Sequence, residues 1–252
     1  MKKYALIGRN INYSFSPILH KKIFEKYKID GSYEIINLQE EEIESFLENM
    51  REGSFQGINV TIPYKEKIMK YLDHISPEAM EIGAVNTVTM KNGKLYGYNT
   101  DYFGFLETIK KIKLDCKNKK TFILGNGGAS KTVAKVLKDL EARVTIVSRN
   151  PKGDGVISYE EFSKEKGYLI VNGTPLGTFP NIGQCPVTAE ILGNFDFAID
   201  LIYNPRVTKF LSLSKQGANG FYMLVAQGVK AQELWQNMPM ALDEIYEELE
   251  NL

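Results

Sequence analysis

A glycine-rich turn joins an apolar run to a helical pattern in the stretch Phe122-Ile123-Leu124-Gly125-Asn126-Gly127-Gly128-Ala129-Ser130-Lys131. Gly125 permits a tight turn where the predicted strand ends, and Gly127 lets backbone amides approach a pyrophosphate. The first amides of the following helix would donate to phosphate oxygens. Ser130 occupies the third position of the fingerprint, where a small residue allows close packing of the helix. This strand–turn–helix context favours a dinucleotide site over a purely structural turn.

Apolar runs and helical patterns alternate on both sides of this turn. After it we predict strands at 143–147, 168–172 and 195–199, a last strand near Gly220, and helices at 128–140, 223–235 and 241–249. Before it we predict strands at 4–7, 33–38, 57–61, 84–90 and 95–98, and helices at 17–28, 40–52, 63–72, 77–82 and 102–112. Asn92-Gly93 predicts a hairpin turn between the last two of these strands. The βαβ alternation indicates an α/β protein whose parallel sheet carries helices on both faces.

Composition excludes several classes of function. The 252 residues include 31 Lys and Arg and 31 Asp and Glu, so the net charge gives no reason to expect nucleic acid or an anionic membrane as a partner. With two cysteines and two histidines, a disulfide framework or a metal site is not expected. No apolar run approaches the roughly 18 residues that a membrane span needs. We read the N-terminus as a buried strand and not as a signal peptide, and we expect a cytoplasmic location.

The strand after the glycine-rich turn bears on the choice of cofactor. It ends in Ser148-Arg149-Asn150, with Lys152 close behind and no acid at the strand end. An NAD site usually places an acid there for the ribose 2′-hydroxyl, whereas a guanidinium suits the 2′-phosphate of NADP. The pattern favours NADP over NAD. The alternative is a surface arginine with no ligand.

Polar residues at the ends of other elements suggest a second binding site. Ser14 and Ser16 alternate on an extended segment, although Ser16 before Pro17 also fits a helix N-cap. The helix that follows is expected to bury an apolar face of Ile18, Leu19, Ile23, Phe24 and Tyr27. Further candidates, none diagnostic alone, are Thr61, Lys65, Asn86, Asp101, Tyr203 and Gln227. Many neutral hydrogen-bonding groups with one lysine and one aspartate suit a small polyhydroxylated acid.

Seven motifs, in order along the whole chain, resemble those of the shikimate dehydrogenase family. They are Ser14-Phe15-Ser16-Pro17, Asn59-Val60-Thr61-Ile62-Pro63-Tyr64-Lys65, Gly83-Ala84-Val85-Asn86-Thr87, Asn99-Thr100-Asp101, Gly125-Asn126-Gly127-Gly128-Ala129, Asp200-Leu201-Ile202-Tyr203-Asn204-Pro205 and Met223-Leu224-Val225-Ala226-Gln227. The chain length also matches. Each motif alone is modest support, but seven in order are highly specific.

The resemblance implies a role for each candidate residue. Lys65 and Asp101 would be the catalytic pair, and Ser14 and Ser16 would hold the substrate carboxylate. The remaining substrate contacts would be Thr61, Asn86, Tyr203 and Gln227. The cofactor pyrophosphate would be bound by Gly125, Asn126, Gly127, Gly128 and Ala129. The adenosine ribose and its phosphate would meet Ser148, Arg149, Asn150 and Lys152, and the nicotinamide side would be lined by Asn172, Thr174, Leu201 and Gly220.

The resemblance also implies the architecture and the reaction. Residues 1–101 and 222–252 would form an α/β substrate-binding domain to which the C-terminal helices return, and residues 102–221 a Rossmann-type NADP(H)-binding domain. The activity would be NADPH-dependent reduction of 3-dehydroshikimate to shikimate, a step toward chorismate and the aromatic amino acids, by a monomer or homodimer. The alternatives are a quinate/shikimate dehydrogenase that uses NAD, and a non-catalytic dinucleotide-sensing protein on the same scaffold.

Overall fold

The chain divides into two compact units, each with its own sheet. The structure is a computed structural model, and it describes residues 1–12 and 14–251. One unit comprises Met1–Phe103 and Val225–Leu252, and the other comprises Gly104–Leu224. We call them the first and the second unit. Both boundaries fall inside continuous helices, α4 (Thr100–Lys111) and α9 (Phe221–Gln236).

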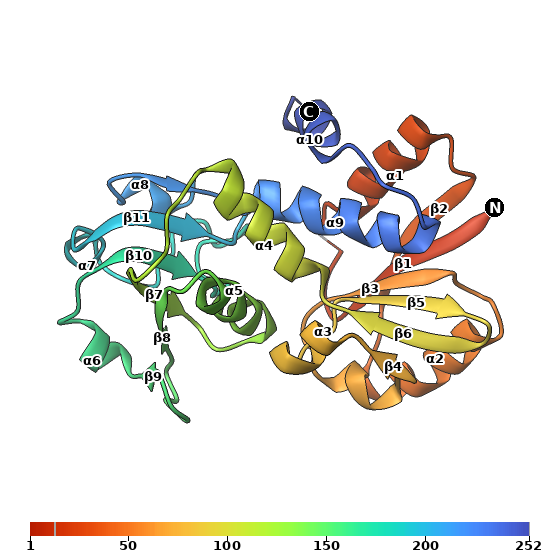
Figure 1. Cartoon of the computed structure of the whole chain (residues 1–252), viewed down its shortest axis with the longest axis horizontal. Coiled ribbons are helices and arrows are strands. Elements are labelled where there is room, and N and C mark those ends of the chain that lie inside the picture. Colours follow the sequence, from red (N-terminus) through yellow and green to blue (C-terminus); the bar gives the residue numbers. More distant parts are fainter. Residues whose placement is uncertain (13, 252) are drawn as a thin grey trace. The chain divides into compact units, whose positions relative to one another are not determined.

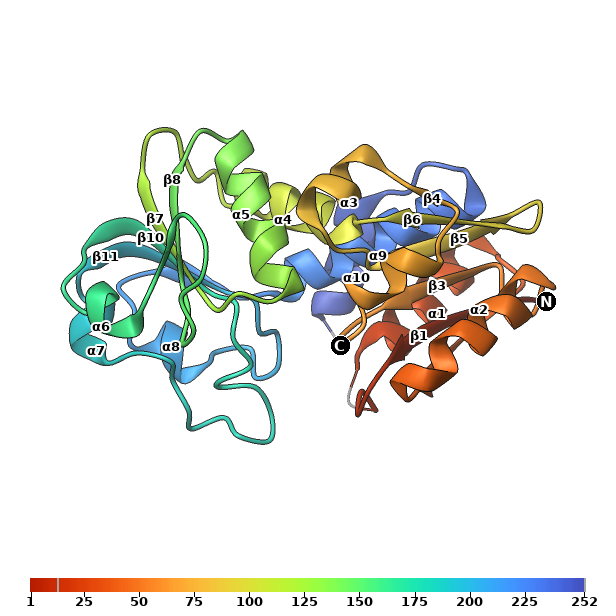
Figure 2. The ribbon, with the colours of Figure 1, turned by 90° about the horizontal axis from the view of Figure 1, so that it is seen from below.

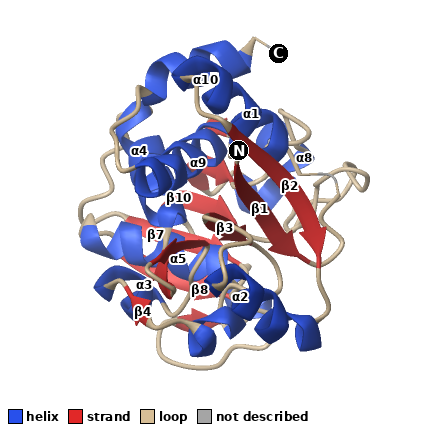
Figure 3. Cartoon of the chain, turned by 90° about the vertical axis from the view of Figure 1, so that its right-hand side faces the viewer, coloured by secondary structure: helices blue, strands red, loops and turns tan. Residues whose placement is uncertain are grey.

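The first unit is built on a six-stranded mixed sheet. The strands lie in the order β2-β1-β3-β5-β6-β4. Strands β1, β2 and β3 pair in parallel, as Figure 3 shows for β1 and β2, whereas β5 pairs antiparallel with both β3 and β6. Along the chain the strands are β1 (Lys2–Gly8), β2 (Gly31–Asn37), β3 (Gly57–Val60), β4 (His74–Ile75), β5 (Thr87–Lys91) and β6 (Lys94–Tyr98).

Helices cover both faces of this sheet (Figure 1). Successive side chains of strand β1 point to opposite faces and so contact both layers of helices. Tyr4 packs on one face with Phe24 of α1 and Trp235 of α9. Ala5 and Ile7 pack on the other face, against helix α2. The helices of this unit are α1 (Ser16–Tyr27), α2 (Ile43–Arg51), α3 (Pro77–Ile82) and α10 (Leu242–Glu250), with most of α9 and 3-10 turns at Glu40–Glu42 and Lys67–Tyr71.

The return of the C-terminal helices to the first unit is confirmed. Lys26 of α1 forms ion pairs with Glu244 and Glu248 of α10, at 2.9 and 2.8 Å. The Trp235 indole donates to the carbonyl of Val88 in β5, at 3.1 Å. The predicted hairpin at Asn92-Gly93 is also confirmed, since both residues have positive φ angles, of 52° and 72°.

Three expectations for the first unit are wrong. Ile18 is 50% exposed, and His20, at 0%, takes an inward position on α1 instead. One residue turns a helix by about 100°, so a stripe centred on Leu19 and Ile23 brings His20 inward and leaves Ile18 outside. Ser16 is not the N-cap, because it is the first helical residue and Phe15 precedes it as the cap. Only Lys67–Tyr71 of the expected helix at 63–72 is helical, as a 3-10 turn.

The second unit is a parallel sheet of six strands in the order β12-β11-β10-β7-β8-β9. The chain lays down β7, β8 and β9 in one direction and then crosses back to place β10 beside β7. Its strands are β7 (Lys120–Leu124), β8 (Arg143–Val147), β9 (Val156–Ile157), β10 (Gly167–Asn172), β11 (Phe195–Asp200) and β12 (Gly217–Ala218). In a doubly wound fold, ligands bind where this reversal occurs, at the carboxyl ends of the two central strands.

Helices cover both faces of the second sheet as well (Figure 2). Helix α5 (Gly128–Asp139) packs on β7 and β8. Three short helices lie over the other face around a core of Phe122 and Phe195: α6 (Tyr159–Phe162), α7 (Ala189–Leu192) and α8 (Lys209–Ser212). This is the predicted α/β fold. No helix within 1–12 or 14–251 is both long enough and apolar enough to cross a membrane.

Candidate active site

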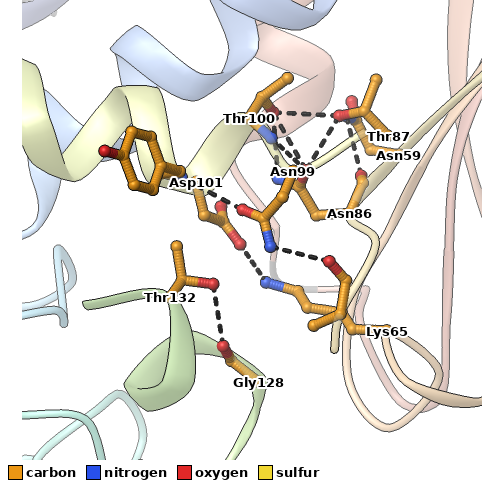
Figure 4. Close-up of polar contacts among 11 residues, drawn as sticks. Asn59, Lys65, Asn86, Thr87, Asn99, Thr100, Asp101, Gly128 and Thr132 are labelled. Atoms are coloured by element: carbon orange, nitrogen blue, oxygen red, sulfur yellow. Dashed lines mark hydrogen bonds and ion pairs between the residues drawn. The ribbon is translucent and has the colours of Figure 1, made fainter. Parts of the chain in front are cut away.

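Lys65 and Asp101 form a close ion pair in the first unit. The Lys65 Nζ atom lies 2.6 Å from Asp101 Oδ2, and the two side chains are 16% and 9% exposed. Lys65 follows strand β3 in a turn, and Asp101 lies in the first turn of α4, so Figure 4 shows the two groups converging from different elements. An ammonium group held this way is a positioned proton donor.

The backbone around this pair is tied by a second set of hydrogen bonds. Asn99 caps α4, because its Oδ1 atom accepts from the amide of Tyr102 at 3.1 Å. Its Nδ2 atom donates to the carbonyl of Ala84 at 2.9 Å. The next residue, Val85, donates its amide to the carbonyl of Lys65 at 2.8 Å. Neighbouring residues therefore anchor both the start of α4 and the turn that carries Lys65.

Asn86 fastens the start of α4 to the sheet. Its Oδ1 atom accepts from the amide of Thr100 at 2.6 Å, and its Nδ2 atom donates to the Thr100 hydroxyl at 3.0 Å. The residue is 2% exposed. This capping role was not predicted from the sequence, which singled out Asn86 only as a substrate contact. Since Thr100 directly precedes Asp101, Asn86 also helps to place that carboxylate.

The two serines at the start of α1 lie together, but not on the extended segment that was expected, because Phe15 between them has a helical conformation. Ser14 Oγ donates to Ser16 Oγ at 3.1 Å and accepts from the amide of Ser16 at 3.2 Å. Thr61 follows strand β3, and its amide donates to the carbonyl of Ile7 at 3.0 Å. Gln227 lies on α9 and is 8% exposed. These residues belong to the first unit, and Tyr203 belongs to the second.

The glycine-rich turn has the conformation that its sequence predicts. Gly125 has a φ angle of 101°, which favours glycine, and its amide donates to the carbonyl of Val147 at 2.8 Å. Gly127 immediately precedes α5, and a Cβ atom built on it would meet no atom within 4 Å. The turn follows β7 at the point where the strand order reverses. Asn126, Gly128 and Ala129 complete a cradle of backbone amides that fits a pyrophosphate.

The packing around Ser130 explains why a small residue follows the turn. It is fully buried, and a Cβ atom built on Gly173, which follows β10, would lie 2.4 Å from its Oγ atom. A Cβ atom on Gly125 would in turn lie 3.2 Å from the carbonyl oxygen of Gly173. The loops after β7 and β10 are therefore packed backbone against backbone.

The proposed nicotinamide-side residues differ in how they are placed. Asn172 is fully buried, and its Nδ2 atom donates to Asp200 Oδ1 at 3.0 Å. Its Oδ1 atom accepts from the amide and the hydroxyl of Thr174, at 3.0 and 2.7 Å, so the side chain shapes the loop after β10. A Cβ atom on Gly220 would lie 2.1 Å from the carbonyl oxygen of Leu201, which only glycine permits.

Asp200 is a buried carboxyl that sequence reasoning did not single out as functional. It accepts from the Thr208 hydroxyl at 2.5 Å and from the amide of Ile202 at 3.1 Å, besides the bond from Asn172. Burial raises its pKa to about 6, and these three hydrogen bonds oppose the increase. Asp200 thus joins the ends of β10 and β11 below the loops that follow them.

The residues assigned to the adenosine phosphate lie in the loop after β8. Arg149, Asn150 and Lys152 are exposed, and Ser148 is half-buried. Ser148 Oγ accepts from the amide of Asn150 at 3.2 Å, which bends the loop directly after the strand. The charge of Arg149 acts on Tyr159, whose pKa is raised by burial and lowered to a smaller extent by the guanidinium. Within 1–12 and 14–251, no three His, Cys, Asp or Glu side chains are grouped as a metal site would require.

Comparison with known proteins agrees with this geometry. A family profile described as the shikimate dehydrogenase substrate binding domain matches residues 6–88. A shikimate dehydrogenase (NADP(+)) of Clostridium beijerinckii is 41% identical over 249 residues, which are 94% of this chain and 92% of the relative. The chain belongs to the shikimate dehydrogenase family.

Solved structures of the family superpose on the whole chain. Shikimate dehydrogenase 1 of Peptoclostridium difficile is 42% identical, with a TM-score of 0.94 over 99% of this chain and 98% of the other. Shikimate 5-dehydrogenase of Thermus thermophilus, solved in complex with NADP(H) and shikimate, is 33% identical, with a TM-score of 0.89 over 98% of each chain. The resemblance inferred from the seven motifs is confirmed.

The family site in this chain rests on buried polar residues that sequence reasoning missed. Asn59 of β3 is 4% exposed, donates to the Thr87 hydroxyl at 3.0 Å and accepts from Tyr33 at 2.8 Å. Asn59 lies between Ile58 and Val60 in a four-residue strand that is buried throughout. A side-chain amide is costly to bury without hydrogen-bond partners. The position of Asn59 inside an apolar strand could therefore have indicated, from the sequence, a buried hydrogen-bond network.

Proposed function

We propose that the chain is an NADP-dependent shikimate dehydrogenase, which reversibly reduces 3-dehydroshikimate to shikimate on the pathway to chorismate and the aromatic amino acids. The observation that carries the proposal is the Lys65–Asp101 pair, held at 2.6 Å in a chain that also has a dinucleotide-binding turn. A non-catalytic sensing protein has no need of a lysine and an aspartate fixed from two elements.

The proton-transfer chemistry is assigned to the first unit. Bound NADPH would supply a hydride to the ketone carbon of 3-dehydroshikimate. Lys65 then donates a proton to the ketone oxygen as negative charge grows there, and in the reverse direction it accepts the proton of the alcohol. Asp101 holds the Lys65 ammonium group and accepts a hydrogen bond from a substrate hydroxyl.

The polar side chains proposed as substrate contacts suit a polyhydroxylated acid. Ser14 and Ser16 present two hydroxyls for the substrate carboxylate. Neutral donors and acceptors that surround the ring would be Thr61, Asn86, Tyr203 and Gln227. A ring that carries several hydroxyls needs such groups, because each substrate hydroxyl removed from water must be paired again.

The cofactor is assigned to the second unit, where the residues present fit a dinucleotide. Gly125 to Ala129 would bind the pyrophosphate through backbone amides, with open space at Gly127. Arg149, with Ser148, Asn150 and Lys152, would bind the adenosine ribose and its 2′-phosphate. Asn172, Thr174, Leu201 and Gly220 would form the nicotinamide side. We further propose a cytoplasmic enzyme that acts as a monomer or homodimer on small molecules, without nucleic acid or membrane partners.

Turnover with a matrix of substrates and cofactors tests this proposal. Purified protein is given shikimate or quinate with NADP or NAD, and the nicotinamide absorbance is followed. We expect rapid reduction of NADP with shikimate and at least tenfold slower turnover in the other three combinations. Comparable rates with quinate or NAD would assign the chain to a broader-specificity dehydrogenase. Folded protein that binds NADP without turnover would favour the sensing function.

A further inference from the structure

A buried hydrogen-bond chain crosses the first unit and ends at the start of α4. Tyr33 donates its hydroxyl to Asn59 Oδ1 at 2.8 Å, and Asn59 Nδ2 donates to the Thr87 hydroxyl at 3.0 Å. The Thr87 hydroxyl donates to Asn86 Oδ1 at 3.1 Å, and Asn86 accepts from the amide of Thr100 at 2.6 Å. Figure 4 shows the part of this chain from Asn59 to Thr100 beside Asp101.

Tyr33 also meets the serine pair at the other end of the site. Ser16 is buried and lies one helical turn before His20 on α1, and its side chain opposes the increase in the pKa of Tyr33 that burial produces. Ser16 in turn accepts from Ser14 at 3.1 Å. The Tyr33 hydroxyl therefore joins the Asn59–Asn86 amide pair, and its ring packs through His20 on the helix face that carries Ser16.

The imidazole of His20 fixes the ring of Tyr33. The two rings stack with centroids 3.9 Å apart and planes inclined by 13°. His20 is fully buried, and Gln232 Nε2 lies 2.8 Å from its Nδ1 atom. Gln232 uses its own Oε1 atom to accept from Gln236 at 3.0 Å, so its Nε2 atom is the donor toward His20.

This order of donors fixes the protonation of His20. Since Nδ1 accepts from Gln232, the imidazole proton is on Nε2. Burial lowers the pKa of His20 to about 3, with a smaller opposing effect from the Asn59 side chain, so the ring is neutral near pH 7. Within the described part of the chain, Nε2 has no hydrogen-bond partner. A stacked, neutral ring with a single fixed tautomer is a rigid support for Tyr33.

We propose that Tyr33, held by the stacked ring of His20, is a positioning residue that sets the spacing between the Ser14–Ser16 hydroxyls and the Asn59–Asn86 amides. The inference rests on the proposed function, because these are the groups assigned to a polyhydroxylated carboxylic acid. Tyr33 acts through its neighbours: it places the groups that bind the acid and takes no part in proton transfer.

Substitution Tyr33→Phe tests this role, because it keeps the stacked ring and removes only the hydroxyl. We expect the Kd for shikimate, measured by calorimetry, and the KM for shikimate to rise about tenfold, since a mispositioned donor pair loses roughly the value of one hydrogen bond. The KM for NADP and kcat should stay within twofold of wild type. Tyr27→Phe is the matched control, because Tyr27 is half-buried in the same unit and its hydroxyl accepts from the amide of Ala241 at 2.7 Å.

A double-mutant cycle tests whether His20 acts through Tyr33. His20→Leu, which keeps the site apolar and removes the stack, should raise the KM for shikimate severalfold in wild type but not further in Tyr33→Phe. Tyr33→Phe protein with a lower Tm and an unchanged Kd for shikimate would overturn the proposal in favour of a structural role. Additive effects would overturn the part assigned to His20; should His20→Leu fail to fold, Tyr33→Phe alone decides. Wild-type protein inactive on shikimate would instead overturn the proposed function, and this proposal with it.

Discussion

The two units prepare their sites by different physical means. The first unit uses side chains. Its ion pair at 2.6 Å is supported by a chain of buried amides and hydroxyls that runs from Tyr33 to Thr100, the residue before Asp101. The second unit uses its backbone: a turn at Gly125, the first amides of α5 after Gly127, and loops packed so closely that Gly173 and Gly220 have no room for a Cβ atom. A site of the first kind is altered by changing functional groups, and a site of the second kind by adding atoms.

Removal of the proton donor in the first unit should have the largest effect. We expect Lys65→Met to lower kcat about 10³-fold, within the range that general acid–base catalysis supplies. The Kd for NADP should stay within twofold, because Lys65 belongs to the side-chain site. Lys67→Met is the control, since Lys67 is an exposed lysine nearby that pairs with Glu40 and should leave kcat unchanged. A Lys65→Met enzyme with more than a tenth of the wild-type kcat contradicts the assignment.

One buried group in each unit should make the free energy of unfolding depend on pH, and the two dependences have opposite signs. The pKa of Asp200 in the folded protein, about 6, lies above its usual 3.8, so the native state binds this proton more tightly and the free energy of unfolding falls as pH rises from 3.8 to 6. The pKa of His20, about 3, lies below its usual 6.5, so the stability it contributes is present above pH 6.5 and lost as pH falls toward 3.

Asp200→Asn should separate these two contributions. Removing the titration of Asp200 leaves that of His20, so stability should rise more steeply between pH 4 and 6 than in wild type. The expected difference over this window is about 2 kcal/mol, from a shift of roughly two pKa units of which part lies outside the window. Urea unfolding at both pH values measures it. Parallel curves for wild type and variant would mean that Asp200 is ionised throughout this range.

Arg149→Ala tests a proposed cofactor contact in the second unit that depends on a charged side chain. Loss of a charge-assisted bond to the 2′-phosphate should lower the ratio of kcat/KM for NADP to that for NAD about 30-fold. Arg143→Ala is the control, because Arg143 lies at the start of β8, at the opposite end of the strand from the loop that carries Arg149, and it should leave the ratio unchanged. An unchanged ratio in Arg149→Ala would leave Arg149 as a surface residue.

Gly127→Ala tests whether the backbone-built site of the second unit is altered by adding a single methyl group. The added methyl group meets no protein atom, so Tm should stay within 2 °C, a change that corresponds to at most about 1 kcal/mol. The methyl group would occupy the space assigned to the pyrophosphate, and we expect the KM for NADP to rise roughly tenfold, or 1.4 kcal/mol. Gly183→Ala, also with open space, should change neither quantity. Equal KM values in the two variants would place the pyrophosphate elsewhere.

Local patterns were sufficient to predict most of the fold. The strand at Lys120–Leu124, the helix after Gly127 and the Asn92-Gly93 turn all follow from short-range periodicity and turn chemistry. The short strand at Val156–Ile157 was not predicted, because two residues carry no periodic signal. His20 was not predicted on the buried face of α1, because its partners Tyr33 and Gln232 lie on other elements.

The candidate site was predictable in its parts but not in its connections. Lys65 and Asp101 are separated by 36 positions in the sequence, and nothing local to either indicates that the two groups pair. The resemblance to a family supplied that pairing. The supporting chain from Tyr33 through Asn59 to Asn86 came only from the structure, since its links from Tyr33 to Asn59 and from Asn59 to Thr87 join residues 26 and 28 positions apart.

Isotope transfer in a single turnover tests the central claim most directly. The protein is mixed with 3-dehydroshikimate and NADPH that carries deuterium on both hydrogens at C4 of the nicotinamide, and the product is examined by nuclear magnetic resonance. The account predicts shikimate that carries one deuterium on the carbon that held the ketone, with the hydroxyl proton drawn from solvent. Unlabelled shikimate, label at another carbon, or recovery of unreacted 3-dehydroshikimate from folded protein would contradict it.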